Sequence, residues 1–173
     1  EGGQDGFMRG LFVASTRVGR GHLLYAAEAY HNDGPWEKPD DLRKWNGIVR
    51  FSRGDQRNGF SLTAAGYRAR WSSTDQIPRR AVESGLIDRF GAIDTRGGGE
   101  THRLSLAGEC PRSRRGGLTQ VKAYGVDYGL DLFSNFTYFL DDPVNGDQFE
   151  QKDERNVLGA SVRQRLLPTW FGP

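Results

Sequence analysis

Residues 46–78 read NGIVRFSRGDQRNGFSLTAAGYRARWSSTDQIP and predict two long strands joined by a tight turn. The polar break DQRNG at 55–59 ends in Asn-Gly, which is a strong hairpin signal between alternating segments. Because side chains alternate along a strand, one side of the second strand carries Thr63, Ala65, Tyr67, Ala69 and Trp71. Its other side carries Leu62, Ala64, Gly66, Arg68 and Arg70. A soluble sheet would bury its apolar side against a second layer, whereas a membrane barrel would turn that side to lipid.

The same alternation continues on both sides of this hairpin and predicts about seven long strands. We expect strands at 7–18, 22–32, 45–53, 59–71, 101–109, 119–140 and 156–167. Residues 81–89 could form a short helix, but Gly85 lies within it and Pro78 precedes it. The connections between them alternate between short and long. In an antiparallel meander every second connection emerges at the same end, so the three short turns should lie opposite the three long loops. The predicted fold class is therefore all-β, an antiparallel up-and-down meander.

The segment 119–140 is the clearest of these strands. At about twenty residues it is far longer than the usual five or six of globular sheets. Tyr124, Val126 and Tyr128 alternate with Gly125 and Asp127. A side that presents carboxylates over such a length cannot be a dry core without partners, but it can line water. This strand favours a barrel wall, although alternation alone also fits an ordinary β-sandwich.

Composition narrows the classes of function. The chain has 24 basic and 22 acidic residues, a net charge of +2, which is too balanced to predict nucleic acid as a partner. It contains no run of about 18 apolar residues, which excludes a transmembrane helix. A barrel strand meets lipid only at every second residue and needs no such run. The single cysteine, Cys110, cannot form an internal disulfide.

The sequence offers no recognisable catalytic or metal-binding set. His22, His31 and His102 lie far apart and lack acid or cysteine companions at metal-ligand spacing. The acidic segment 141–147 departs from the spacing of a calcium loop and favours a solvated loop. Residues 97–99, Gly-Gly-Gly, lack the context of a phosphate-binding loop. No nucleophile and base can be matched, so we expect no enzyme activity, no cofactor and no metal.

Four strings of residues carry a resemblance to a known family. They are LLYAAEAYHNDGPW (23–36), KWNGIVRFSRGD (44–55), GFSLTAAGYRARWSSTDQIPRRAV (59–82) and DYGLDLFSNFTYFLDDPVNGDQFEQKDERNVLGASVRQ (127–164). The chain resembles the barrel of TonB-dependent outer-membrane receptors over about 7–171, most densely at 23–95 and 121–166. The resemblance implies a transmembrane barrel of about 22 antiparallel strands with a plugged lumen. It also implies binding and active import of a scarce nutrient such as an iron chelate, cobalamin or a sugar.

This resemblance sets the expected location and partners. Residues 1–173 should be an internal portion of such a barrel, without the plug domain, in a Gram-negative outer membrane. The partners implied are outer-membrane lipid, a small nutrient ligand, and the TonB protein acting through the plug domain of the full-length receptor. We expect loops 33–44, 72–100 and 141–155 outside the cell, and turns 19–21, 55–58 and 110–117 in the periplasm.

The barrel also predicts which side chains meet water and which meet lipid. We expect the lumen face to include Glu28, Arg68, Arg70, Asp127, Asp131, Arg163 and Arg165. We expect these side chains to face lipid or its interfaces: Tyr67, Trp71, Tyr124, Tyr128, Leu130 and Leu132. Two alternatives remain open. One is a soluble β-sandwich that binds carbohydrate through loop aromatics such as Trp36, and the other is a passive porin.

Overall fold

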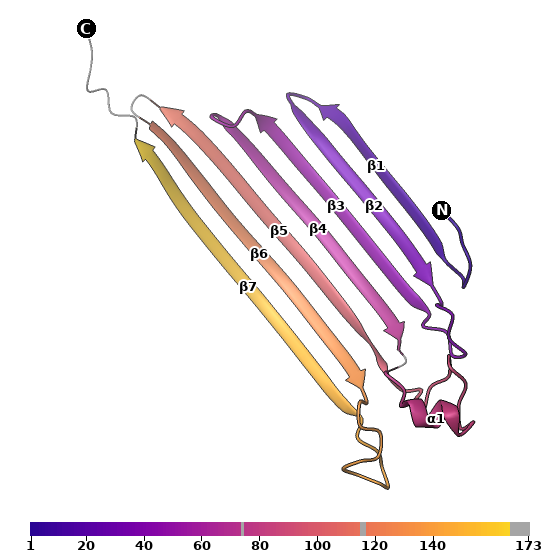
Figure 1. Cartoon of the computed structure of the whole chain (residues 1–173). Helices are drawn as coiled ribbons and strands as arrows, with labels where there is room; N and C mark the ends of the chain where they lie inside the picture. Colours follow the sequence, from indigo (N-terminus) through magenta and orange to yellow (C-terminus); the bar gives the residue numbers. More distant parts are fainter. Residues whose placement is uncertain (74, 115–116, 167–173) are drawn as a thin grey trace.

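A computed structural model describes residues 1–73, 75–114 and 117–166, and these form one antiparallel sheet of seven strands (Figure 1). The strands pair in chain order, so the predicted up-and-down meander is confirmed. Their bounds are β1 Met8–Val18, β2 Gly21–Asn32, β3 Leu42–Gly54, β4 Gly59–Ser72, β5 Gly98–Arg114, β6 Gly117–Ser134 and β7 Phe149–Leu166. Within the described residues β1 and β7 do not pair with each other, and the sheet is not closed.

The turn between β3 and β4 forms where Asn-Gly predicts it. The Asp55 carboxylate accepts the backbone N–H groups of Arg57 at 2.8 Å and Asn58 at 2.7 Å. The Asp55 N–H donates to the Asn58 carbonyl at 3.2 Å. Gly54 has a φ of +83°, a conformation that glycine adopts without steric cost. The polar break therefore reverses the chain because one carboxylate satisfies two of its backbone donors.

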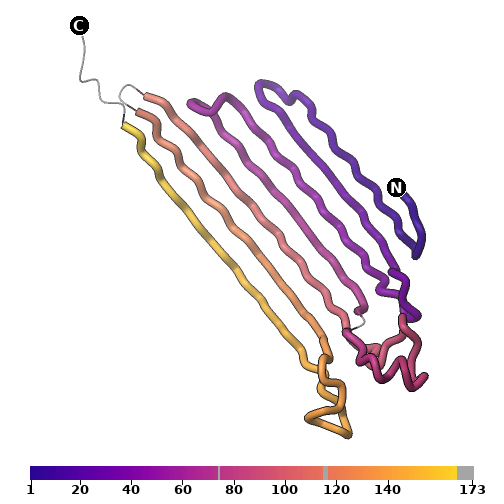
Figure 2. The backbone as a smooth tube through the Cα atoms, viewed as in Figure 1, coloured from indigo at the N-terminus to yellow at the C-terminus, as the bar shows by residue number. Residues whose placement is uncertain are grey.

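Short turns and long loops lie at opposite ends of the sheet, as predicted. Figure 2 shows turns 19–20 and 55–58, and the adjoining ends of β5 and β6, at the upper end of the view. The described parts of loops 33–41, 73–97 and 135–148 lie at the lower end. The helix α1, Arg79–Glu83, lies in the second loop. It ends before the predicted residue 89 because Gly85 has a φ of +73°, which terminates a helix. No helix in the described part of the chain is long and apolar enough to cross a membrane.

Several predicted element boundaries are wrong. The expected turn at 110–117 is mostly strand, since β5 continues to Arg114 and β6 begins at Gly117. Pro111 is tolerated there because the continuous pairing of β5 with β4 ends at Glu109, and beyond it β5 has only an isolated bridge between Arg112 and Asn58 on that side. The strand expected at 119–140 ends at Ser134, and the last strand begins at Phe149 instead of residue 156. Residues 115–116 of the predicted turn, and Leu167 at the predicted end of the last strand, lie outside the described residues.

The register assigns each side chain to one of two faces, because directly opposed residues of antiparallel strands share a face. The pairing runs without a break along all six strand pairs. We call the apolar face the side that bears the row Ala14, Tyr25, Val49, Ala64, Leu106, Gly125 and Leu158. We call the polar face the side that bears the row Leu11, Glu28, Asn46, Tyr67, Arg103, Tyr128 and Arg155.

The sheet is a single layer without a hydrophobic core. In the described residues the only buried hydrophobic side chains are Ala69 and Ala81. Large apolar side chains on the apolar face are exposed instead, for example Leu158 at 88%, Leu104 at 58% and Phe12 at 57%. A sandwich would cover this face with a second sheet, and the described residues contain only one.

Candidate functional site

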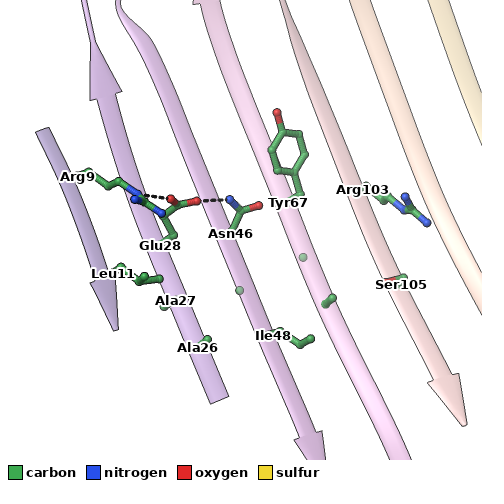
Figure 3. Close-up of a pocket in the computed structure, with 13 residues that line it drawn as sticks. Arg9, Leu11, Ala26, Ala27, Glu28, Asn46, Ile48, Tyr67, Arg103 and Ser105 are labelled. Carbon is green, nitrogen blue, oxygen red and sulfur yellow. Dashed lines mark hydrogen bonds and ion pairs between the residues drawn. The ribbon is translucent and has the colours of Figure 1, made fainter. Parts of the chain in front are cut away.

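A carboxylate on β2 joins side chains from three strands on the polar face (Figure 3). The two oxygens of Glu28 accept hydrogen bonds from Arg9 Nε and Asn46 Nδ2, each at 2.6 Å. Lys44 Nζ lies 3.5 Å from the same carboxylate. The register explains this cluster, because Asn46 lies directly opposite Glu28. The Glu28 side chain is only 13% exposed, and charge-assisted hydrogen bonds hold it in place.

An open concavity of about 420 Å³ lies beside this cluster. Figure 3 shows Tyr67 and Arg103 on the far side of it from Glu28, on β4 and β5. Within the described residues no carboxylate lies within 4.0 Å of the Arg103 guanidinium. The concavity is lined mainly by Arg9, Leu11, Glu28, Asn46, Ile48, Tyr67, Arg103 and Ser105. Its lining therefore includes the cations Arg9 and Arg103, the phenol of Tyr67 and the amide of Asn46 beside the aliphatic side chains of Leu11 and Ile48. In Figure 3 the Arg103 side chain extends to the side away from Glu28.

Tyrosine and arginine alternate across the neighbouring strands. Tyr67, Arg103, Tyr128 and Arg155 are directly opposed in turn on β4, β5, β6 and β7. Directly opposed side chains are close enough to interact, so each tyrosine flanks an arginine. Arg155 is already engaged, because its Nε donates to the Asp153 carboxylate at 2.7 Å. Arg103 is thus the cation of this row that remains available to a ligand.

The loops at the long-loop end are joined by one buried amide. Asn135 is 1% exposed, and its Nδ2 donates to the Asp94 carboxylate at 2.8 Å. Its backbone N–H donates to the Asp75 carboxylate at 2.6 Å, and its Oδ1 accepts the Tyr138 N–H at 2.7 Å. A hydrogen bond from Arg96 is the main cause that lowers the pKa of Asp94 to about 2. Loops 73–97 and 135–148 are therefore held together by hydrogen bonds to charged groups.

Loop 33–41 also contacts the end of β4 and loop 73–97. The Ser72 N–H donates to the Asp40 carbonyl at 2.7 Å, and the Glu37 N–H donates to the Phe90 carbonyl at 3.1 Å. The rings of Trp36 and Phe90 pack with centroids 6.1 Å apart. Trp36, the aromatic considered for carbohydrate binding, is thus engaged in a contact between loops.

The acidic segment of the third loop directs its carboxylates at its own backbone. The Asp147 carboxylate accepts the N–H groups of Leu140 at 2.8 Å and Asp142 at 2.7 Å. These backbone donors lower the pKa of Asp147 to about 2. Asp142 in turn accepts the N–H of Asn145 at 2.9 Å. These carboxylates stabilise the fold of the loop, which accounts for their clustering.

One group of side chains has atoms at metal-ligand separation. His31, Asp33 and Asp41 each offer a ligand atom, and these atoms lie within 4.8 Å of one another. The sequence did not predict this group, because Asp41 reaches His31 only through the fold of loop 33–41. Asp41 also contacts Arg43 at 2.8 Å and Arg70 at 3.7 Å. A cation at this position would compete with two guanidinium groups.

The residues predicted to face the lumen do not share one face. Glu28, Arg163 and Arg165 lie on the polar face, whereas Arg68, Arg70, Asp127 and Asp131 lie on the apolar face. The six residues predicted to face lipid do share a face, but it is the polar face that also bears Glu28. The two predicted sets are therefore inconsistent with each other. Alternation defines two sides within a strand, and only the register shows which sides of different strands coincide.

Several residues of the polar-face cluster were missed from sequence. Arg9, Lys44, Asn46 and Arg103 come from strands whose alternation is visible. Their proximity depends on strand pairing, which is fixed by the lengths of the turns. Counting outward from the Asn-Gly turn would have placed Asn46 opposite Tyr67 and so identified part of the set.

Comparisons with known proteins identify no relative. No family model, no curated protein and no solved structure matches this chain. What the chain does must therefore be inferred from the geometry of its own sheet and loops.

Proposed function

We propose that this sheet is part of the wall of a large transmembrane β-barrel, in a TonB-dependent receptor of a Gram-negative outer membrane. The receptor binds a scarce nutrient, an iron chelate, cobalamin or a sugar, and imports it actively. The work is binding and transport, without chemistry. The observation that carries the barrel is an uncharged band that crosses the apolar face of all seven strands.

The apolar band is continuous from β1 to β7. Every strand contributes at least four successive apolar-face residues without charge, which is about 20 Å along a strand or more. The band comprises the apolar-face residues within 8–18, 21–29, 45–51, 60–66, 104–110, 117–125 and 158–166. On the polar face, charges such as Glu28, Arg50 and Lys122 interrupt the corresponding region. An exposed uncharged surface of this extent is suited to lipid and not to water.

The edge of the band runs obliquely across the strands. Toward the long loops it begins at Met8 on β1 and at Leu158 on β7. Leu158 on β7 lies in the same row of opposed residues as Ala14 on β1. Ala14 is six residues beyond Met8, where the band begins on β1. The edge thus shifts by about one residue per strand. At about 3.3 Å per residue and about 4.8 Å between strands, this shift corresponds to a tilt of about 35°. Strands of outer-membrane barrels are tilted by a similar angle.

The topology supports the same proposal. Short turns at one end and long loops at the other are typical of outer-membrane barrels. Each edge strand also leaves backbone donors and acceptors without a strand partner in the described residues, which lipid does not tolerate. Further strands that close the barrel would satisfy them. The soluble sandwich lacks this support, because the described residues form one layer.

In this proposal the apolar face meets lipid and the polar face lines the lumen. Tyr67, Trp71, Tyr124, Tyr128, Leu130 and Leu132 then point into the lumen with Glu28, Arg163 and Arg165. Arg68, Arg70, Asp127 and Asp131 point outward beyond the edge of the band, at the level of lipid headgroups. This orientation reverses the sequence-based assignment of ten side chains, because the charge-free band lies on the face opposite the tyrosines.

The orientation can be tested with two adjacent residues, Leu106 on the apolar face and Ala107 on the polar face. Each is replaced in turn by cysteine in a Cys110→Ser background, labelled with an environment-sensitive fluorophore and measured in outer-membrane vesicles. We expect spin-labelled lipid to quench the fluorophore at 106, and aqueous iodide to quench the one at 107. Equal quenching by iodide at both sites would overturn the membrane barrel.

Active uptake and passive diffusion are separated by energy dependence. Import by a receptor stops when the inner-membrane proton gradient is collapsed or the TonB protein is absent. Diffusion through a porin continues under both conditions. The sequence strings that resemble TonB-dependent receptors favour the first outcome.

A further inference from the structure

The polar face carries a large excess of positive charge. Its strand residues include three carboxylates, Glu28, Glu109 and Asp153. They include nine basic side chains: Arg9, Arg17, Lys44, Arg50, Arg103, Lys122, Arg155, Arg163 and Arg165. On the apolar face the strands are nearly balanced, with seven basic and five acidic residues. The basic ones are Arg43, Arg53, Arg68, Arg70, Arg112, Arg114 and Lys152, and the acidic ones Glu100, Asp127, Asp131, Glu150 and Glu154.

The few carboxylates of the polar face are already neutralised. Each is matched to a basic partner: Glu28 to Arg9, Glu109 to Lys122, and Asp153 to Arg155. Five arginines of this face have no carboxylate within 4.0 Å in the described residues: Arg17, Arg50, Arg103, Arg163 and Arg165. Unmatched cations on one wall of a narrow aqueous path raise the local concentration of anions.

Arg103 has the surroundings of a ligand contact. It borders the concavity of about 420 Å³, and its direct neighbours across the strands are Tyr67 and Tyr128. A guanidinium binds two oxygens of a carboxylate or phosphate at once, and the two phenol hydroxyls can donate to the same oxyanion. Asn46 and Ser105 supply further polar groups at the same concavity.

We propose that the polar face selects a small anion that carries several carboxylate or phosphate oxygens, with Arg103 as its principal contact. This inference rests on the proposed function, in which the polar face lines the path of the nutrient. It narrows the nutrient to an anionic one, such as an anionic metal chelate, over a neutral sugar.

The test measures binding of simple probes by titration calorimetry to the purified chain in non-ionic detergent. The probes are citrate for carboxylates, pyrophosphate for phosphates and maltose as a neutral comparator. We expect one or both anions to bind more tightly than maltose, and the affinity to fall as salt is raised. Tighter binding of citrate assigns a carboxylate ligand, and tighter binding of pyrophosphate assigns a phosphate.

The decisive variant is Arg103→Gln, with Arg68→Gln as its matched control. Arg68 is an exposed arginine on the neighbouring strand but on the opposite face. We expect Arg103→Gln to weaken anion binding by about tenfold or more, because a hydrogen bond to a charged group is lost. Arg68→Gln should leave it unchanged, and Arg103→Lys should retain part of it. If Arg103→Gln does not fold, the proposal is tested by the anion affinity of Arg103→Lys and by the salt dependence of binding to the unchanged chain. Anion binding that is equal in Arg103→Lys and insensitive to salt would overturn it.

Failure of this proposal is distinct from failure of the barrel. Absence of anion binding, or an equal loss in Arg68→Gln, would overturn anion selection while the lipid quenching at residue 106 is unaffected. Anion binding that depends on Arg103, with no lipid contact at 106, would retain the anion site and reject the membrane barrel.

Discussion

Among single residues, Asn135 links two of the long loops outside the strands. Its amide is buried and its three hydrogen bonds reach Asp75, Asp94 and Tyr138. A buried amide that loses its partners costs about 1–3 kcal/mol. The sequence placed Asn135 inside a strand, because the alternation of the preceding residues continues past it. What ends the strand is the side-chain cap on Tyr138, which alternation does not report.

A pH dependence follows from Asp94. Its folded pKa is lowered from the ordinary 3.8 to about 2, mainly by Arg96. A lowered carboxylate pKa gives stability that is present above the unfolded pKa and is lost as the pH falls toward the folded pKa. Asn135 of loop 135–148 donates to the same carboxylate, so we expect the contact between loops 73–97 and 135–148 to weaken between about pH 4 and pH 2. Pepsin, which acts across this range, should cleave them faster as the pH falls. Asp94→Asn should flatten that dependence, and an unchanged slope would contradict the assignment.

Among the elements, the β3–β4 hairpin depends on one glycine. Gly54 has a positive φ, and a Cβ there would collide with the Asn58 carbonyl. We expect Gly54→Ala to destabilise the sheet by roughly 1–2 kcal/mol, which a denaturant titration in detergent would measure. Gly47→Ala is the matched control, since a Cβ at Gly47 meets nothing within 4 Å. An equal shift in both variants would show that the turn conformation does not limit stability.

The strands themselves were largely predictable, and their faces were not. Period-two alternation identified seven strands in order because each has one face of apolar character. The β5–β6 turn was misplaced because Pro111 and the run of arginines look like a break. The prediction that Arg68 and Glu28 share a face was wrong. The two residues lie on different strands, and only the register shows whether they face the same side. The polar-face cluster around Glu28 could not be predicted without that register.

At the scale of the whole molecule, a single-layer sheet without a core depends on its environment for its stability. Strands β2 to β6 have partners on both sides, whereas β1 and β7 have one strand partner each in the described residues. In isolation, we expect backbone amides of β7 to exchange with solvent faster than those of β5, as hydrogen-exchange mass spectrometry would measure. In outer membranes, pairing of β7 with a further strand should slow the exchange of its backbone amides to the rate seen for β5. Rapid exchange of β7 in the membrane would mean that the sheet stays open there.

The amide of Asn135 also has a mechanical consequence. Loops 73–97 and 135–148 emerge between different pairs of strands and are joined by the hydrogen bonds of Asn135 and by one from the Tyr138 hydroxyl to the Gln76 carbonyl. Neither loop can move far without breaking these bonds or displacing the other. A molecule that displaced one loop would therefore be expected to displace the other. We therefore expect the two loops at this end of the sheet to move together rather than independently.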